Sequence, residues 1–242
     1  MEKKIGQTEE LSFYSAELDE TISLIVYLPA SFSPLYKYSL LLAQDGQDYY
    51  TLGRMPRLIE HLLDQGSIPN TIFVGIPYRS IEDRREKYHP DGAKQNVYIR
   101  FLAHELVPFL DSRYPTYQMG QSRILMGDSL AGTVSLKAAL TYPHTFGKVI
   151  MQSPFVNDHL LDQVKAFKHP SLLEMYHIIG QQETGVRLTN GTICDFLTPN
   201  RELHRLLDEK RFNVLYEEFA GNHSWTYWQP DLKRALSSML SI

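Results

Sequence analysis

Short β-rich apolar runs alternate with amphipathic helical stretches along most of this chain, and this alternation restricts the fold more than any other feature of the sequence. Runs at residues 38–43, 71–76 and 148–152 are typical of strands that are buried on both faces. Strands that alternate with helices in this way form a mostly parallel sheet with helices on both sides. The sequence therefore predicts a three-layer α/β protein whose sheet has about eight strands.

The first two strand-like runs differ from the later ones, because only a short polar turn joins residues 11–16 to residues 21–28. They predict an antiparallel pair at the edge of the sheet. Three more strands are expected, at residues 122–126, 172–179 and 214–219. Helices are expected at residues 57–64, 95–111 with a kink near Pro108, 131–142, 158–167, 199–210 and 230–240. Residues 44–48, 79–87 and 181–198 are predicted as loops.

Length and composition favour one domain over residues 1–242, with no separate cap domain, because 43% of the 242 residues are hydrophobic. The 24 basic and 28 acidic residues are interspersed, which argues against nucleic-acid binding. No apolar run approaches the ~18 residues that a membrane span needs, and the polar N-terminus lacks a secretory signal. We therefore expect a cytoplasmic protein, for which a homodimer is one possible state.

A nucleophile motif lies between a predicted strand and a predicted helix. The pentapeptide G-D-S-L-A at residues 127–131 matches the G-x-S-x-G elbow with alanine at its last position. Small residues on either side of Ser129 allow the strand and the helix to pass close to each other. The alternative is a serine that only caps the helix. We interpret Ser129 as a nucleophile, which requires a nearby base to accept its proton.

His223 is the predicted base. It follows the last predicted strand in a tight turn that begins with Gly221 and Asn222, and loops at the carboxyl ends of parallel strands carry the chemistry of such sheets. The other histidines lack such a placement. His104 and the glutamate after it suggest a zinc-binding H-E-x-x-H pattern, but Pro108 stands where the second histidine should be. No metal and no cofactor are therefore expected.

The third member of the predicted triad is an acid that orients the imidazole. Glu183 is the first carboxylate after the strand at residues 172–179, and we predict that it is this acid. Asp195 remains the alternative, since it lies later in the same connection.

Two backbone N–H groups are predicted to form the oxyanion hole. One belongs to Leu130, the residue after the nucleophile. The other belongs to Gln47, in the connection that follows the strand at residues 38–43, where Gly46 permits unusual backbone geometry.

Substrate contacts are expected from the residues around these groups. Trp225 follows the predicted base and is expected to form a wall of the pocket. Basic residues cluster in the predicted loop at residues 79–87, where they suit an anionic substrate. The predicted substrate-binding residues are Asp45, Gly46, Arg85, Asp128 and Trp225.

Several of these motifs occur together, in the same order, in a known family. The D-G-Q sequence at residues 45–47, the elbow at 127–131, Ser153-Pro154 and G-N-H at residues 221–223 resemble the esterase D-like family of α/β-hydrolases, nearest to its siderophore-esterase-like members. The resemblance implies a serine carboxylic-ester hydrolase that acts on a small-molecule ester through an acyl-serine intermediate. Acyl transfer to an acceptor other than water, and a non-catalytic binding protein of the same fold, are the alternatives.

Overall fold

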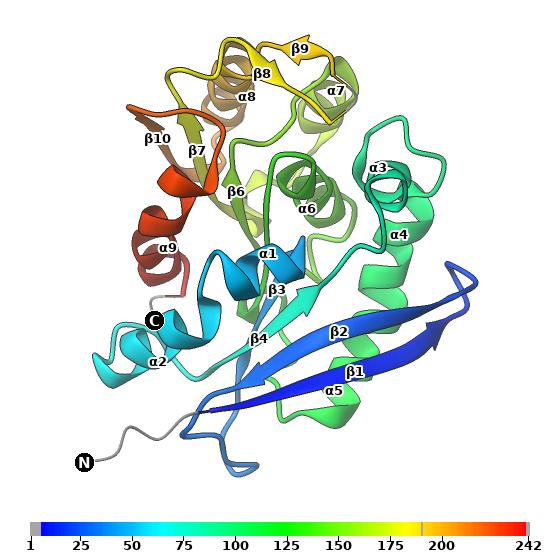
Figure 1. Ribbon diagram of the computed structural model, residues 1–242, viewed down its shortest axis with the longest axis vertical. Coiled ribbons are helices and arrows are strands. Elements are labelled where there is room, and N and C mark those ends of the chain that lie inside the picture. The colour runs from blue at the N-terminus through cyan, green and yellow to red at the C-terminus, as the bar shows by residue number, and fades with distance from the viewer. Residues whose placement is uncertain (1–5, 190, 241–242) are drawn as a thin grey trace.

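The computed structural model describes residues 6–189 and 191–240, and its main feature is an eight-stranded sheet with helices on both faces (Figure 1). The strand order is β1-β2-β4-β3-β5-β6-β7-β10. The strands are β1 Gln7–Ser15, β2 Glu20–Leu28, β3 Ser39–Gln44, β4 Thr71–Ile76, β5 Arg123–Asp128, β6 Lys148–Gln152, β7 Glu174–Gly180 and β10 Asn213–Phe219. The six strands from β4 to β10 are parallel, and β1 and β2 form the predicted antiparallel edge.

Helices cover the two faces of the sheet unequally. The helices are α1 Gly46–Thr51, α2 Met55–Asp64, α3 Ile81–Tyr88, α4 Gln95–Phe101, α5 Val107–Arg113, α6 Leu130–Thr141, α7 Asp158–Ala166, α8 Leu197–Glu209 and α9 Trp225–Met239. Helices α1, α2 and α9 lie on one side of the sheet (Figure 1). Their side chains form one core with the sheet, and those of α4 to α8 form the other. Within the described ranges, no helix is long and apolar enough to cross a membrane.

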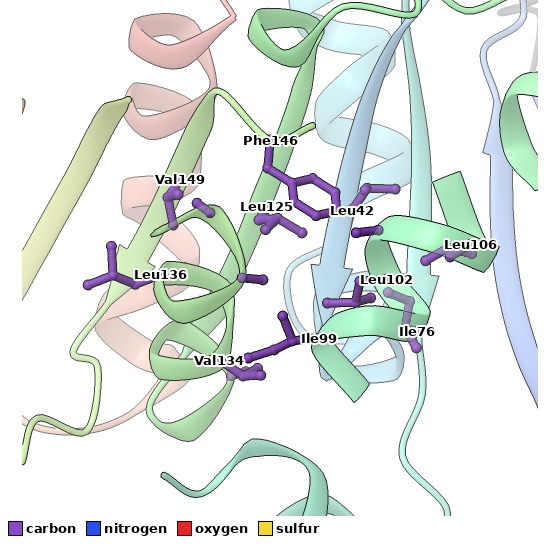
Figure 2. Close-up of a cluster of buried hydrophobic side chains, with 14 of the residues drawn as sticks. Leu42, Ile76, Ile99, Leu102, Leu106, Leu125, Val134, Leu136, Phe146 and Val149 are labelled. Atoms are coloured by element: carbon purple, nitrogen blue, oxygen red, sulfur yellow. The ribbon is translucent and has the colours of Figure 1, made fainter. Parts of the chain in front are cut away.

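Alternation along β3 shows how the sheet serves both cores. Leu40 and Leu42 belong to one core, whereas Leu41 and Ala43 belong to the other. All four are fully buried, as expected for a central strand whose successive side chains point to opposite faces. Figure 2 shows Leu42 and Leu102 among the side chains of the larger core.

Two of the predicted loops are helices. Residues 46–51 form α1, and residues 81–88 form α3. The sequence of α3 is mostly charged, so it has no apolar stripe that would reveal a helix. It is stabilised instead by local polar contacts: the Ser80 hydroxyl caps its first turn by accepting the Asp83 N–H at 3.1 Å, and Lys87 pairs with Asp83 at 2.8 Å.

Two predicted helices also differ from their expected course. The helix expected at residues 95–111 is divided into α4 and α5 by a π-helical turn at Leu102–Leu106, and Pro108 is the second residue of α5. A proline has no N–H to donate, so it interrupts the series of backbone hydrogen bonds along the helix. The irregular turn lies where this interruption occurs. The last helix begins at Trp225 rather than at Pro230, which lies inside it.

The predicted loop at residues 181–198 contains a short antiparallel pair, β8 Val186–Arg187 with β9 Ile193–Cys194. This pair lies beyond the carboxyl ends of β7 and β10 (Figure 1). Side chains from it pack on Phe196 in a small third cluster. The connection therefore forms a partly apolar wall at the edge of the sheet that carries the predicted chemistry.

Candidate active site

Ser129 lies at the carboxyl end of β5, in the sharp turn before α6. Its backbone has φ 52° and ψ −127°, a region that residues with a side chain seldom adopt. The turn is held by the Ser129 N–H, which donates to the carbonyl of Gln152 at 3.0 Å. A Cβ at Gly127 would lie 2.3 Å from the carbonyl carbon of Ala131. The turn therefore needs glycine at 127, and alanine fits at 131, where it is fully buried.

His223 and Glu183 meet at the ends of β10 and β7. The Nδ1–H of His223 donates to Oε2 of Glu183 at 2.6 Å. The other carboxylate oxygen, Oε1, accepts the Gly180 N–H at 2.9 Å and the Ser153 hydroxyl at 2.7 Å. Glu183 is completely buried, and these three bonds fix its orientation. Such an acid holds the imidazole in one tautomer and stabilises its protonated form.

Aromatic rings fix the plane of the imidazole. The ring of Phe196 lies 4.6 Å from that of His223, and Trp228 meets it edge-on at 4.8 Å. Trp228 also donates its indole N–H to Ser153 at 3.1 Å. The His223 side chain keeps 16% of its surface exposed. Because Nδ1 is engaged by Glu183, Nε2 is the nitrogen left to exchange a proton with a substrate or a nucleophile.

Gln152, at the end of β6, connects the surroundings of Ser129 with those of His223. Its carbonyl accepts the Ser129 N–H, and its side-chain amide donates to the carbonyl of Trp228 at 3.0 Å. Tyr49 donates its hydroxyl to Gln152 Oε1 at 3.1 Å. The elbow and the wall behind the imidazole thus share one buried polar anchor.

Gln47 and Leu130, the predicted oxyanion donors, both lie in the first turn of a helix. Leu130 is the first residue of α6, and Gln47 is the second residue of α1. N–H groups at these positions have no intrahelical acceptor, and the helix dipole favours negative charge beside them. Gly46 brings α1 against β4, because a Cβ there would lie 2.2 Å from the Ile76 nitrogen. This close packing fixes the position of the Gln47 N–H relative to the end of β4.

The structure buries three of the residues that the sequence predicts to bind substrate: Asp45, Gly46 and Asp128. Asp45 is only 2% exposed, and its carboxylate forms a bidentate pair with Arg84. Asp128 is 7% exposed, and among the described residues nothing donates a hydrogen bond to its Oδ1. Burial, followed by the charge of Asp45, raises the pKa of Asp128 to about 8. Both carboxyl groups lie beneath the site rather than at its surface.

Replacing Asp128 by asparagine is expected to make the protein more stable, most of all at high pH. An aspartate whose folded-state pKa is raised loses stability as the pH rises from its unfolded pKa, near 4, through about 8. Asparagine is uncharged throughout and has nearly the same shape. The free energy of unfolding in urea, measured from pH 5 to pH 9, should therefore fall less steeply in Asp128→Asn. Parallel curves for the two proteins would contradict a buried, protonated Asp128.

The basic cluster predicted at residues 79–87 is largely engaged within the protein. Arg79, Arg84 and Lys87 each pair with an acidic residue. Arg85 is exposed on α3, and no ion pair within the described part of the chain involves it. Trp225 is half-buried and meets Tyr49 edge-on at 4.9 Å. Of the predicted substrate-binding side chains, Arg85 and Trp225 are therefore the ones that remain accessible.

The two candidate acids, Asp195 and Glu183, have different surroundings in the structure. Asp195 is exposed and accepts the Thr198 N–H at 3.1 Å in the first turn of α8, whereas Glu183 contacts the imidazole. Ser153 is one of the site residues to which sequence reasoning assigns no role. It follows β6 with φ 48°, and its place in a Ser-Pro pair after a strand is the only local signal of its importance.

Comparisons with known proteins identify the family of the chain. Residues 15–239 match the family model described as "Putative esterase". The chain is 51% identical over 240 residues to "Uncharacterized protein YjcH" of Bacillus subtilis (strain 168), which covers 99% of this chain and 100% of that protein. It is 24% identical over 181 residues to an acetyl esterase of Caldicellulosiruptor saccharolyticus, covering 64% of this chain and 68% of the relative.

A solved structure shows the same fold. The enterobactin esterase FES from Shigella flexneri superposes with a TM-score of 0.83 over 96% of this chain, at 17% sequence identity. The chain spans 58% of the length of that structure. The superposition establishes the predicted α/β-hydrolase fold, with its mostly parallel sheet and antiparallel edge.

Proposed function

Because the chain belongs to the esterase family and is a hydrolase that acts on esters, we propose that it is a serine carboxylic-ester hydrolase. Its triad is Ser129, His223 and Glu183, and its natural substrate is a small-molecule ester. The observations that carry the proposal are the bond between His223 Nδ1 and the buried Glu183 and the strained serine at a nucleophile elbow.

Acylation begins at Ser129. His223 Nε2 takes the hydroxyl proton as the oxygen attacks the ester carbonyl, and Glu183 stabilises the imidazolium that forms. The Leu130 and Gln47 N–H groups donate to the oxyanion of the tetrahedral intermediate, and each such donor is worth ~2.7–4 kcal/mol in comparable sites. The intermediate collapses when His223 returns the proton to the leaving alcohol, which leaves the acyl group on Ser129.

Deacylation repeats these steps with water. His223 removes a proton from a water molecule, the hydroxide attacks the acyl carbonyl, and the same two N–H groups hold the second oxyanion. Collapse of this intermediate breaks the bond to Ser129, whose oxygen recovers its proton from His223. The carboxylic acid is released, and the enzyme returns to its starting state.

Trapping the acyl-enzyme tests this mechanism directly. With p-nitrophenyl acetate, rapid mixing should release a burst of nitrophenol that approaches one equivalent of enzyme if deacylation is the slower step. Mass spectrometry of acid-quenched samples should find one acetyl group on the peptide that contains Ser129. Turnover of the ester with the acetyl group on another residue would reject Ser129 as the nucleophile.

A further inference from the structure

Asp45 occupies the N-cap position of α1 but does not cap the helix. A carboxylate at this position commonly accepts N–H groups of the first turn. Here the backbone of Asp45 is left-handed, with φ 54° and ψ 40°, and its side chain makes no capping bond. Its carbonyl accepts the Asp48 N–H at 2.9 Å. The Gln47 N–H is thus left without the acceptor that an N-cap carboxylate would provide.

Arg84 holds the Asp45 carboxylate in this unusual orientation. Its Nε lies 2.8 Å from both carboxylate oxygens, and its Nη2 lies 2.5 Å from Oδ2. The guanidinium is held between the rings of Tyr78 and Tyr88, whose centroids lie 5.8 and 5.6 Å from its central carbon. Tyr88 also accepts the backbone N–H of Asp45 at 3.4 Å. Helix α3 therefore fixes both the side chain and the backbone of Asp45.

This contact has two consequences for the N-terminus of α1. It keeps the carboxylate away from the Gln47 N–H, so that this donor stays open to a ligand. It also places a positive charge beside a buried negative one, next to the point where an oxyanion would form. A buried carboxylate without its cation would oppose that oxyanion, since charges interact strongly away from water.

We propose that Arg84 is a positioning residue that keeps the oxyanion hole open by drawing the Asp45 carboxylate away from the N-terminus of α1. The inference rests on the proposed ester hydrolysis. Without Arg84, the carboxylate is free to rotate and to cap its own helix. It then occupies the donor that the tetrahedral intermediate requires, so the enzyme inhibits itself with one of its own side chains.

The test compares Arg84→Ala with the double variant Arg84→Ala/Asp45→Gly. The single variant should lose at least about tenfold in kcat toward p-nitrophenyl acetate, within the ~10²–10³ limit for loss of one oxyanion donor, while KM changes little. Phosphonylation of Ser129 by a fluorophosphonate, which passes through a similar oxyanion, should slow in parallel. The double variant should recover several-fold of both rates, because glycine accepts a positive φ and has no carboxylate.

Arg123→Ala is the matched control. Arg123 forms a similarly buried pair with Asp111 at 2.6 Å, at the start of β5 and hence the opposite end of the sheet. Its loss should lower the melting temperature and leave kcat near the wild-type value. Arg84→Lys keeps the charge but not the planar fork, and it should fall between wild type and Arg84→Ala. It also serves as the folded comparison if the alanine variant does not fold.

The outcomes separate this inference from the proposed function. A wild-type enzyme without esterase activity would overturn both. If wild type is active and Ser129→Ala is not, but kcat of Arg84→Ala matches that of Arg123→Ala, then only the role of Arg84 is wrong. A double variant no more active than Arg84→Ala would likewise overturn it, since removing the Asp45 carboxylate should free the Gln47 donor again.

Discussion

Replacing Ser129 by alanine is expected to reduce kcat by about 10⁴- to 10⁶-fold, the range seen when a serine nucleophile is removed from a triad. The reason is chemical: without the hydroxyl no acyl-enzyme can form, so His223 can only assist direct attack by water. The residual rate would come from the oxyanion donors and from substrate binding. The measurement is kcat/KM with p-nitrophenyl acetate, corrected for hydrolysis in buffer.

Ser135→Ala provides the control for this experiment. Ser135 lies on α6, the helix that follows the nucleophile, and it is fully buried with a hydroxyl that no described residue bonds. Its loss should leave kcat/KM within about twofold of wild type. If Ser129→Ala retained wild-type activity, the elbow would be a structural turn and the nucleophile would have to be sought elsewhere.

Replacing Glu183 by glutamine is expected to lower kcat by about 10²- to 10⁴-fold with little effect on the fold. Glutamine can still accept the Gly180 N–H and the Ser153 hydroxyl through its amide oxygen. Its amide nitrogen then faces His223 Nδ1 as a donor, which favours the wrong tautomer and no longer stabilises the imidazolium. Circular dichroism and thermal unfolding would establish that the variant is folded before its kcat is compared.

Asp195→Asn is the natural counterpart. Asp195 carries the same type of charge in the same connection but accepts the Thr198 N–H at the start of α8 instead of contacting the imidazole. Its substitution should cost at most about 1 kcal/mol of stability through a weakened cap, with kcat unchanged. The opposite pattern, in which Asp195→Asn is inactive and Glu183→Gln is not, would transfer the role of the acid to Asp195.

The strands were predictable from sequence because a buried strand has a local signal, a continuous run of apolar residues. A continuous apolar run such as Thr71–Ile76 can satisfy burial on both faces only inside a covered sheet. Helix α3 has no such signal, because its stability depends on a serine cap and on ion pairs with residues of β2 and of α3 itself. Periodicity of apolar residues cannot reveal a helix that is charged along most of its length.

Some residues of the candidate site could be singled out from the sequence, and others could be found only in the structure. Ser129 and His223 were accessible to sequence reasoning, because each has glycine nearby at the end of a strand. The pairing of Asp45 with Arg84 joins residues 39 positions apart. No local sequence pattern therefore indicates that Asp45 is buried. Ser153 and Trp228 are brought to Glu183 and His223 only by tertiary packing. Their roles therefore required the structure.

Asp45, Ser129 and Ser153 share a property with an evolutionary consequence. Each has a positive φ, between 48° and 54°, and each stands directly beyond the end of β3, β5 or β6. Such conformations cost on the order of 1–3 kcal/mol each. The three together therefore cost an amount comparable to much of a typical domain's net stability. Substitutions that relieve the strain at these three residues would thus raise the free energy of unfolding. Under the proposed mechanism, the same substitutions would lower the catalytic rate. Lineages that keep the activity must seek thermal tolerance elsewhere, in the two cores and at the solvent-exposed helices.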